Sequence, residues 1–266
     1  MHNDPFAQVK AAQREGWALF VPLEAYTTPP AVKLVEFARV QRGEKLLDVA
    51  CGTGVVAVTA ARAGAQVKAL DLCPVLLERA RWNTGTAGVA IEFTEGDVEE
   101  LPYPDASFDV VVSQYGHMFA PRPEVAVGEM LRVLKPGGRI AFSTWPPELF
   151  IGRLFGLVSQ YLPPPPGVPS VGLWGDPNII RERLGDRVVD LAFEREAMHV
   201  PALSPQHVRQ SFETTAAPVV KLVQTLKDDA SRLAQFRTEM EALIAAYTRG
   251  NQVRQQFLMT RAVKRP

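Results

Sequence analysis

A glycine-rich turn after an apolar run is the first stretch of this sequence whose residue types could do chemistry. In LLDVACGTG (46–54), Asp48 precedes Gly52 and Gly54. Small residues in a turn that follows a strand allow backbone N–H groups to approach a ligand closely. Residues 52–57 also fit G-x-G-x-x-A, a fingerprint of dinucleotide pyrophosphate sites. The turn therefore predicts a nucleotide-type ligand at the end of a strand.

Three acids near predicted strand ends indicate which ligand this is. Asp48 lies four residues before Gly52, where a carboxylate disfavours pyrophosphate and suits an ammonium or sulfonium group. Asp71 ends the second apolar segment, a position where a carboxylate accepts hydrogen bonds from ribose hydroxyls. Asp97 follows the third predicted strand, where it would accept from an adenine amino group while Val98 offers its backbone N–H. Together they favour a cationic adenosyl ligand over a dinucleotide.

The elements that must position these acids alternate between apolar strands and helices. This alternation is typical of a parallel sheet covered on both faces. We expect strands at 45–50, 66–71, 89–94, 108–113, 139–144, 188–200 and 252–263, and helices at 54–63, 74–82 and 123–134. Residues from about 5 to 40 are expected to be helical, with Thr27 and Thr28 capping a helix that starts at Pro29. Lys135-Pro136-Gly137-Gly138 predicts a helix stop and a turn.

Four motifs in order give the chain a family resemblance: LLDVACGTG, VKALDLCP, EGDVEELPYPDASFDVVVS and EMLRVLKPGG. With them the chain resembles the class I S-adenosylmethionine-dependent methyltransferases, most closely the small-molecule members seen in ubiquinone and menaquinone biosynthesis. The resemblance covers roughly residues 40–145. It implies an α/β fold, with a Rossmann-like, seven-stranded, mostly parallel sheet, an antiparallel last strand and helices on both faces. It agrees with a helical cap inserted before the last strand.

S-adenosylmethionine is the cofactor that the resemblance implies, and the motifs assign its contacts residue by residue. The segment from Asp48 to Gly54 would hold the amino-acid end, Asp71 the ribose, and Asp97 the adenine edge. The residues expected at the cofactor are Asp48, Ala50, Cys51, Gly52, Gly54, Asp71, Leu72, Asp97, Val98, Ser113 and Gln114.

His117 is the candidate catalytic residue, because SQYGHMFAP follows the fourth strand, where methyl acceptors lie in this family. A neutral histidine could deprotonate or orient an acceptor hydroxyl; the alternative is a loop histidine bonded to a backbone carbonyl. Methyl transfer from a sulfonium is an in-line displacement, so the protein mainly supplies orientation and a dry site. Cys51 and Cys73 have no metal-type spacing and are expected to be small apolar fillers; no metal site is predicted.

Composition limits the functions that this sequence can have. Lys and Arg number 29 among 266 residues, as do Asp and Glu, so the net charge is zero and a nucleic-acid partner is disfavoured. No apolar run is long enough to span a membrane, and no signal peptide is recognised, so we expect a cytoplasmic protein. We expect one methyltransferase domain over 1–266, with N-terminal helices at 1–40, a cofactor core at 41–145, and an acceptor-side half at 146–266 that includes a helical insertion at about 204–249.

The expected function is methyl transfer to a hydrophobic or aromatic small molecule held by the N-terminal helices, the His117 loop and the helices at about 204–249. The alternatives are a non-catalytic module that binds S-adenosylmethionine, and an NAD(P)-dependent reductase, which leaves Asp48 and Asp97 unexplained. A nucleic-acid methyltransferase is disfavoured further by Ser113-Gln114-Tyr115-Gly116, which stands where DNA amino-methylating enzymes carry Asn/Asp-Pro-Pro-aromatic. No feature of the sequence specifies an oligomeric state or the acceptor atom.

Overall fold

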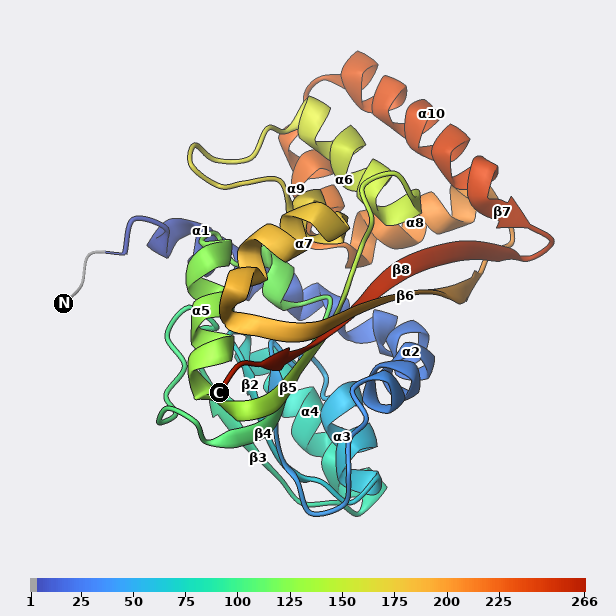
Figure 1. Ribbon diagram of the computed structural model, residues 1–266. Coiled ribbons are helices and arrows are strands. Elements are labelled where there is room, and N and C mark those ends of the chain that lie inside the picture. Colours follow the sequence, from blue (N-terminus) through green and yellow to red (C-terminus); the bar gives the residue numbers. More distant parts are fainter. Residues whose placement is uncertain (1–3) are drawn as a thin grey trace.

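The alternating pattern forms one sheet with the strand order β3-β2-β1-β4-β5-β8-β6. The computed structural model describes residues 4–266 (Figure 1). The strands are β1 (Lys45–Val49), β2 (Gln66–Asp71), β3 (Ile91–Glu95), β4 (Phe108–Gln114), β5 (Leu134–Thr144), β6 (Val188–Pro201), the short β7 (Thr248–Arg249) and β8 (Gln252–Lys264). Strands β1 to β5 pair in parallel, whereas β8 is antiparallel to both β5 and β6. The expected mostly parallel sheet with a reversed last strand is confirmed.

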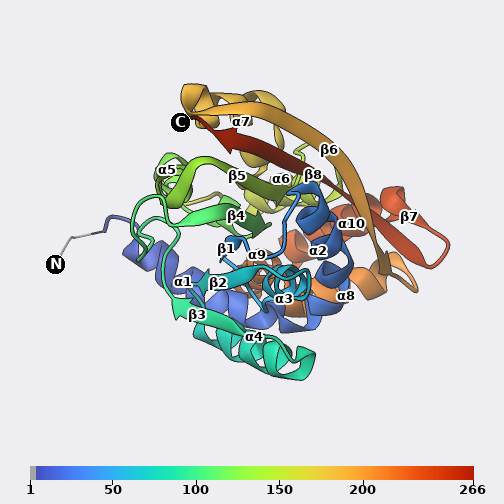
Figure 2. The same ribbon diagram turned by 60° about the horizontal axis from the view of Figure 1, so that its bottom comes forward.

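Helices cover both faces of this sheet. The α-helices are α1 (Ala7–Trp17), α2 (Glu24–Phe37), α3 (Val55–Arg62), α4 (Pro74–Ala87), α5 (Pro123–Val133), α6 (Phe150–Tyr161), α7 (Pro177–Leu184), α8 (Pro205–Thr215), α9 (Ala217–Thr225) and α10 (Ala230–Tyr247). The 3₁₀ turns are η1 (Ala18–Leu23), η2 (His117–Phe119), η3 (Val171–Gly175) and η4 (Gly185–Arg187). Helices α2, α3 and α4 lie on one face, with α5 and α7 on the other (Figures 1 and 2).

The core lies where the central strands are enclosed between these helix layers. Leu46, Leu47 and Val49 of β1 have no exposed surface, nor has the run from Val110 to Val112 in β4. Adjacent residues of a strand point to opposite faces, so a fully buried run requires cover on both sides. The centre of the sheet is therefore a rigid platform whose strand tips can hold polar groups in fixed positions.

Two helical units lie over the carboxyl ends of the parallel strands (Figure 1). The N-terminal arm comprises α1, η1 and the start of α2, whose remaining turns cover the sheet face, and the cap comprises α6, α8, α9 and α10. Helices α8 to α10 are inserted between β6 and β8, and α10 buries Phe236, Met240 and Ile244 at the helical spacing that the sequence predicts. No helix within residues 4–266 is both long enough and apolar enough to cross a bilayer.

Two local predictions are wrong. Helix α2 starts at Glu24, not at Pro29, because η1 continues directly into it; the Thr28 hydroxyl then donates to the Glu24 carbonyl within the helix and caps nothing. Residues 135–138 lie inside β5 as an irregularity in its pairing with β4, and not in a separate turn. The helix before them still ends at Val133, close to the expected stop.

Candidate active site

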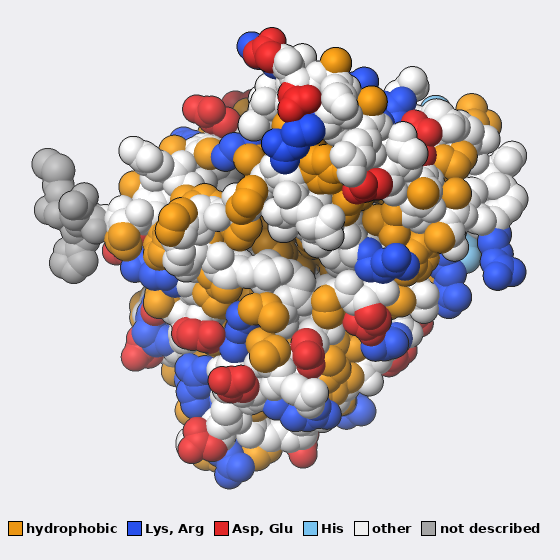
Figure 3. Space-filling model, turned by 90° about the horizontal axis from the view of Figure 1, so that it is seen from above, with side chains coloured by type: hydrophobic (Ala, Val, Ile, Leu, Met, Phe, Trp, Pro, Cys, Tyr) orange, Lys and Arg blue, Asp and Glu red, His pale blue; other side chains and the backbone are white. Residues whose placement is uncertain are grey.

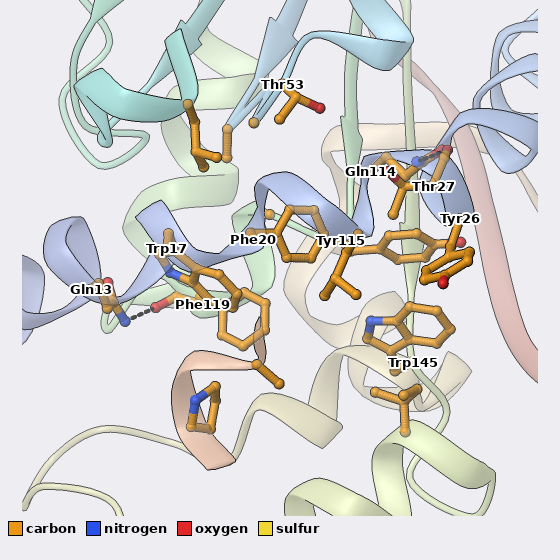
Figure 4. A pocket seen from close by; sticks show the side chains of 18 of the residues that line it. Gln13, Trp17, Phe20, Tyr26, Thr27, Thr53, Gln114, Tyr115, Phe119 and Trp145 are labelled. Atoms are coloured by element: carbon orange, nitrogen blue, oxygen red, sulfur yellow. Dashed lines mark hydrogen bonds between the residues drawn. The ribbon is translucent and has the colours of Figure 1, made fainter. Parts of the chain in front are cut away.

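A cavity lies between the strand tips on one side and the arm and cap on the other (Figure 4). Its cofactor half consists of the lining residues between 48 and 76 and between 96 and 98, with Gln114, Gly116 and Lys10 of α1. Its cap half consists of the lining residues from the rest of the arm, Tyr115, the loop at 119–121, Trp145, the cap, and the adjoining parts of β6 and β8. Residues far apart in the sequence therefore meet at the edge where ligands bind in open α/β sheets.

The glycine turn after β1 has the backbone conformation that its sequence predicts. Gly54 has a φ of +78° and precedes α3, and a Cβ there would lie 3.1 Å from the Cβ of Ala80. Across the cleft, a Cβ on Gly116 would come within 2.6 Å of the Ala50 carbonyl oxygen. The ends of β1 and β4 approach so closely that only glycine fits at residue 116. This contact fixes the floor of the cofactor half.

Asp48 and Asp71 are buried carboxylates at the tips of β1 and β2. Asp48 Oδ2 accepts from the Ala57 N–H at 3.0 Å, while its Oδ1 has no hydrogen-bond partner. Asp71 accepts from the Gly52 N–H at 2.7 Å and from the Cys73 N–H at 2.8 Å. Burial raises the pKa of both carboxyls, and for Asp48 the negative charge of Asp71 raises its pKa further. An unpaired buried carboxylate is costly, so this end of the cavity favours a cationic group.

Asp97, the acid expected at the adenine, lies near the start of the loop after β3 and also lines the cavity. Its Oδ1 accepts from the Glu99 N–H at 2.9 Å, and its Oδ2 lies 2.6 Å from Lys10 Nζ. The same ammonium contacts Asp4 and Glu99 at 2.6 and 2.5 Å, so three acids surround one lysine of the arm. Val98 lines the cavity beside Asp97, as expected.

Gln114 is the last residue of β4 and contacts the arm, and Tyr115 follows it. The Gln114 Nε2 donates to the Thr27 carbonyl at 2.8 Å (Figure 4), and its Oε1 has no partner. Because a carbonyl can only accept, this contact fixes the amide with its oxygen directed away from Thr27. Tyr115 has a φ of +63°, a conformation that is uncommon outside glycine, and its ring stacks on Trp145 with centroids 4.2 Å apart. The end of β4 therefore holds the Gln114 amide and the Tyr115 ring in fixed orientations.

Most of the predicted cofactor residues line one cavity: Asp48, Ala50, Cys51, Gly52, Asp71, Leu72, Asp97, Val98 and Gln114. Gly54 and Ser113 do not line it. Gly54 acts through the turn conformation. Ser113 is fully buried below the cavity, where its hydroxyl accepts from the His117 N–H at 3.2 Å. Their assignment as direct contacts is therefore not supported by their positions.

The position of His117 argues against the catalytic role expected from the sequence. Its side chain does not line the cavity and is buried between Phe142 and Trp174, with each ring centroid 4.7 Å away. Neither ring nitrogen has a hydrogen-bond partner. Burial and the neighbouring Arg183 cation lower the pKa of His117 to about 3. The β4 end turns the side chain of this residue away from the cavity, which residue spacing alone could not reveal.

Sequence reasoning missed several lining residues. Lys10 and Gln13 come from α1, and Ile151, Leu154 and Phe155 come from α6. The signal for α6 was present, since apolar residues recur along FIGRLFGLVSQY at helical spacing. Helix α10 contributes no residue to the described lining, although it belongs to the region expected to hold the acceptor.

The arm contacts the cofactor half at two places: through Lys10 of α1, as described above, and through Glu24 at the start of α2. Glu24 at the start of α2 accepts from Arg79 at 2.8 Å and from the Asn83 amide at 2.7 Å. The same amide of Asn83 donates to the Thr53 carbonyl in the glycine turn at 2.9 Å. The arm, α4 and the glycine turn therefore form one hydrogen-bonded unit around the cavity.

Comparisons with known proteins agree with this geometry. A family model described as a methyltransferase domain matches residues 47–142. The chain is 32% identical to the uncharacterized protein Rv1403c of Mycobacterium tuberculosis over 94% of this chain and 93% of that protein. It is 39% identical to a demethylmenaquinone methyltransferase of Deinococcus radiodurans over 45% of this chain and 52% of that enzyme. Among solved structures, the YcgJ protein of Bacillus subtilis superimposes with a TM-score of 0.57 at 20% identity, covering 89% of this chain and 98% of that one.

The matched domain spans β1 to β5 and therefore includes all three acids of the cofactor half. The solved structure, at 20% identity, supports the fold alone. The unpaired Asp48 oxygen adds a physical reason for a cationic cofactor. These findings place the chain in the class I superfamily of S-adenosylmethionine-dependent methyltransferases, as an enzyme whose cofactor is S-adenosylmethionine.

Proposed function

We propose that this enzyme methylates an uncharged, apolar small molecule, and that aromatic molecules are its preferred acceptors. The observation that carries the proposal is the composition of the cap half. Within residues 4–266, the Lys, Arg, Asp and Glu side chains that line the cavity are Lys10, Asp48, Asp71 and Asp97, and all four belong to the cofactor half. A charged acceptor would meet none of these four side-chain types in the cap half, where the lining histidine is His207, and it would lose its hydration there.

Aromatic rings form two walls of the cap half (Figure 4). On the arm side, Trp17 and Phe119 pack with centroids 4.5 Å apart, and Phe119 packs edge-on against Phe155 at 5.8 Å. On the sheet side, the Tyr115 ring stacks on Trp145. Aromatic pairs contribute directional packing beyond simple burial. Facing walls of this kind suit a planar acceptor.

The cofactor half has residues suited to each part of S-adenosylmethionine. The unpartnered oxygens of Asp48 and Gln114 are available to the ammonium end, Asp71 to the ribose, and Asp97 with Val98 to the adenine. When bound, the cofactor supplies an activated methyl group that an acceptor takes by in-line displacement. The chain's own contribution is then to bind both molecules, align them and exclude water with the arm and cap.

The surface supports a small-molecule acceptor over a nucleic acid. Figure 3 shows basic and acidic side chains interspersed on the arm and cap face, with no extended area of either sign. The chain has 29 basic and 29 acidic residues. Nucleic-acid binding draws most of its affinity from concentrated positive charge, which this face lacks.

A turnover assay with a graded panel of acceptors tests the proposal. The enzyme is incubated with S-adenosylmethionine and neutral phenols, neutral aliphatic alcohols, aromatic carboxylates or aliphatic amines, and S-adenosylhomocysteine is quantified by mass spectrometry. We expect turnover to be highest with the neutral phenols and lowest with the charged compounds. Preferred turnover of charged compounds would contradict the proposed acceptor class. Cofactor binding by calorimetry without turnover of any compound would favour the non-catalytic alternative.

A further inference from the structure

We infer that Lys10 of the N-terminal arm is a positioning residue for adenine recognition, acting by holding the Asp97 carboxylate in one orientation at the edge of the cofactor half. The inference rests on the proposed cofactor geometry. It goes beyond that geometry because Lys10 lies outside the four methyltransferase motifs, from which the cofactor contacts were assigned. Lys10 lies outside the matched domain at 47–142. Its role follows from three features of its surroundings.

The first feature is the face of α1 on which Lys10 lies. Lys10, Gln13 and Trp17 all line the cavity, and their spacing places them on one side of the helix. Gln13 donates to the Phe119 carbonyl at 2.8 Å, which holds this side of α1 against the loop after β4. Lys10 is one turn nearer the chain's start, so it extends the same helix face towards Asp97.

The second feature is that both oxygens of Asp97 are engaged. Oδ1 accepts from the Glu99 N–H at 2.9 Å and Oδ2 from the Lys10 ammonium at 2.6 Å. Two contacts on different oxygens fix the rotation of a carboxylate. Each carboxylate oxygen can accept a further hydrogen bond, so the group remains competent to accept from an adenine amino group.

The third feature is the support behind the ammonium. Lys10 Nζ also contacts Asp4 and Glu99, and the Glu99 side chain is fully buried. Arg122 in turn donates to Glu99 through its backbone N–H at 2.6 Å and through its guanidinium at 2.8 Å. The ammonium is therefore held from the side opposite the cavity, and its position does not depend on Asp97 alone. Charge-assisted bonds of this kind are short and directional.

The test measures discrimination between two nucleoside ligands. S-adenosylhomocysteine carries the 6-amino group that Asp97 would accept from, and S-inosylhomocysteine carries an oxygen in its place. The proteins are wild type, Lys10→Met, which keeps the unbranched stem without the charge, and Lys10→Arg, which restores a cation. Arg14→Met is the matched control, because Arg14 lies on the same helix, pairs with Glu95 at 2.5 Å and does not line the cavity.

Wild type should prefer the adenosyl ligand by about tenfold or more, the usual effect of one charge-assisted hydrogen bond. Lys10→Met should lose most of this preference by weakening the adenosyl ligand alone, Lys10→Arg should recover it, and Arg14→Met should match wild type. The ratio compares two ligands on one sample, so partial unfolding of a variant does not change it.

Two results would overturn the inference. Equal weakening of both ligands in Lys10→Met would mean that Lys10 only supports the packing of the arm. Tighter adenosyl binding in the same variant would mean that Lys10 competes with adenine for Asp97. Failure of the proposed function is distinct from both, because wild-type protein would then lack binding of the adenosyl ligand or turnover in the acceptor assay, whatever residue 10 is.

Discussion

The cofactor half of the cavity contains buried carboxylates held by backbone N–H groups, whereas most residues that line the cap half are apolar. In the cofactor half, Asp48 and Asp71 project from the tips of neighbouring strands and bond to backbone N–H groups. In the cap half, Phe119 and Phe155 come from a 3₁₀ turn and a helix and touch mainly other apolar groups. One half presents charged groups at fixed points, and the other presents a mainly apolar surface.

This difference predicts that substitutions in the two halves separate cofactor binding from acceptor use. Electrostatic and hydrogen-bonded contacts at buried points lose much of their energy when one partner is removed. Apolar contacts are spread over many neighbours, so the loss of one side chain is partly compensated by the others. The largest effects are therefore expected in the cofactor half.

Asp71→Ala should give the largest loss of cofactor affinity. Removing charge-assisted hydrogen bonds to the ribose should cost about 1.5–3 kcal/mol, or roughly a 10- to 150-fold rise in the dissociation constant. Isothermal titration with S-adenosylhomocysteine measures it. Glu92→Ala is the control, because Glu92 is exposed on β3 and pairs only with Lys68. Unchanged affinity in Asp71→Ala would remove this residue from the cofactor site.

The raised pKa values of Asp48 and Asp71 predict that acidification weakens cofactor binding. Burial keeps these carboxyls partly protonated at pH values above the ordinary value of 3.8, and a cationic ligand favours their ionised forms. Binding should therefore release protons, and affinity should fall by up to about tenfold per pH unit for each proton released. Titrations of S-adenosylmethionine in buffers of different ionisation enthalpy measure both quantities.

The folding stability of the ligand-free protein depends on pH in the opposite direction to the cofactor affinity. A carboxyl whose pKa is raised on folding stabilises the fold at low pH, and this contribution is lost as pH rises from about 3.8 through the raised value. Asp48→Asn removes one such group, so its cofactor affinity should vary less with pH than that of wild type. If the affinity of wild type began to fall only near pH 3.8, neither carboxyl would have the pKa that its burial predicts.

The two halves also differ in how far the sequence predicts them. Asp48, Asp71 and Asp97 can be located from sequence because each lies within two residues of a strand end, and the strand end fixes where such a residue lies in the fold. Phe155 and Lys10 could not be located, since their contribution depends on how α6 and α1 pack over the sheet. The prediction for His117 was wrong for the same reason. The residue follows β4 in the chain, but packing directs its side chain away from the cavity.

Substitution of an aromatic wall residue should affect the acceptor and leave the cofactor unaffected. Phe155→Leu keeps apolar volume and removes one aromatic ring from the cavity wall, and an aromatic pair between that ring and the acceptor would contribute about 0.5–1.5 kcal/mol. We expect kcat/KM for a neutral aromatic acceptor to fall roughly 2- to 12-fold, with unchanged affinity for S-adenosylhomocysteine. Arg153→Gln, an exposed change on the same helix, is the control. An equal loss for aliphatic and aromatic acceptors would argue against recognition by stacking.

His117 offers the smallest expected effect on turnover and the clearest effect on acid stability. Its imidazole is buried without hydrogen bonds and lies outside the cavity, so His117→Leu should change kcat by less than about twofold near neutral pH.

The lowered pKa of about 3 for His117 means that the unfolded chain takes up a proton at pH 6.5 and below while the folded chain does not. Wild type should therefore lose about 1.4 kcal/mol of folding free energy per pH unit below roughly pH 6 from this group, and His117→Leu should lose less. Denaturant unfolding at pH 7 and pH 5 measures the difference. A large loss of turnover with an unchanged pH dependence of stability would restore His117 to the active site and place the boundary between the two halves elsewhere.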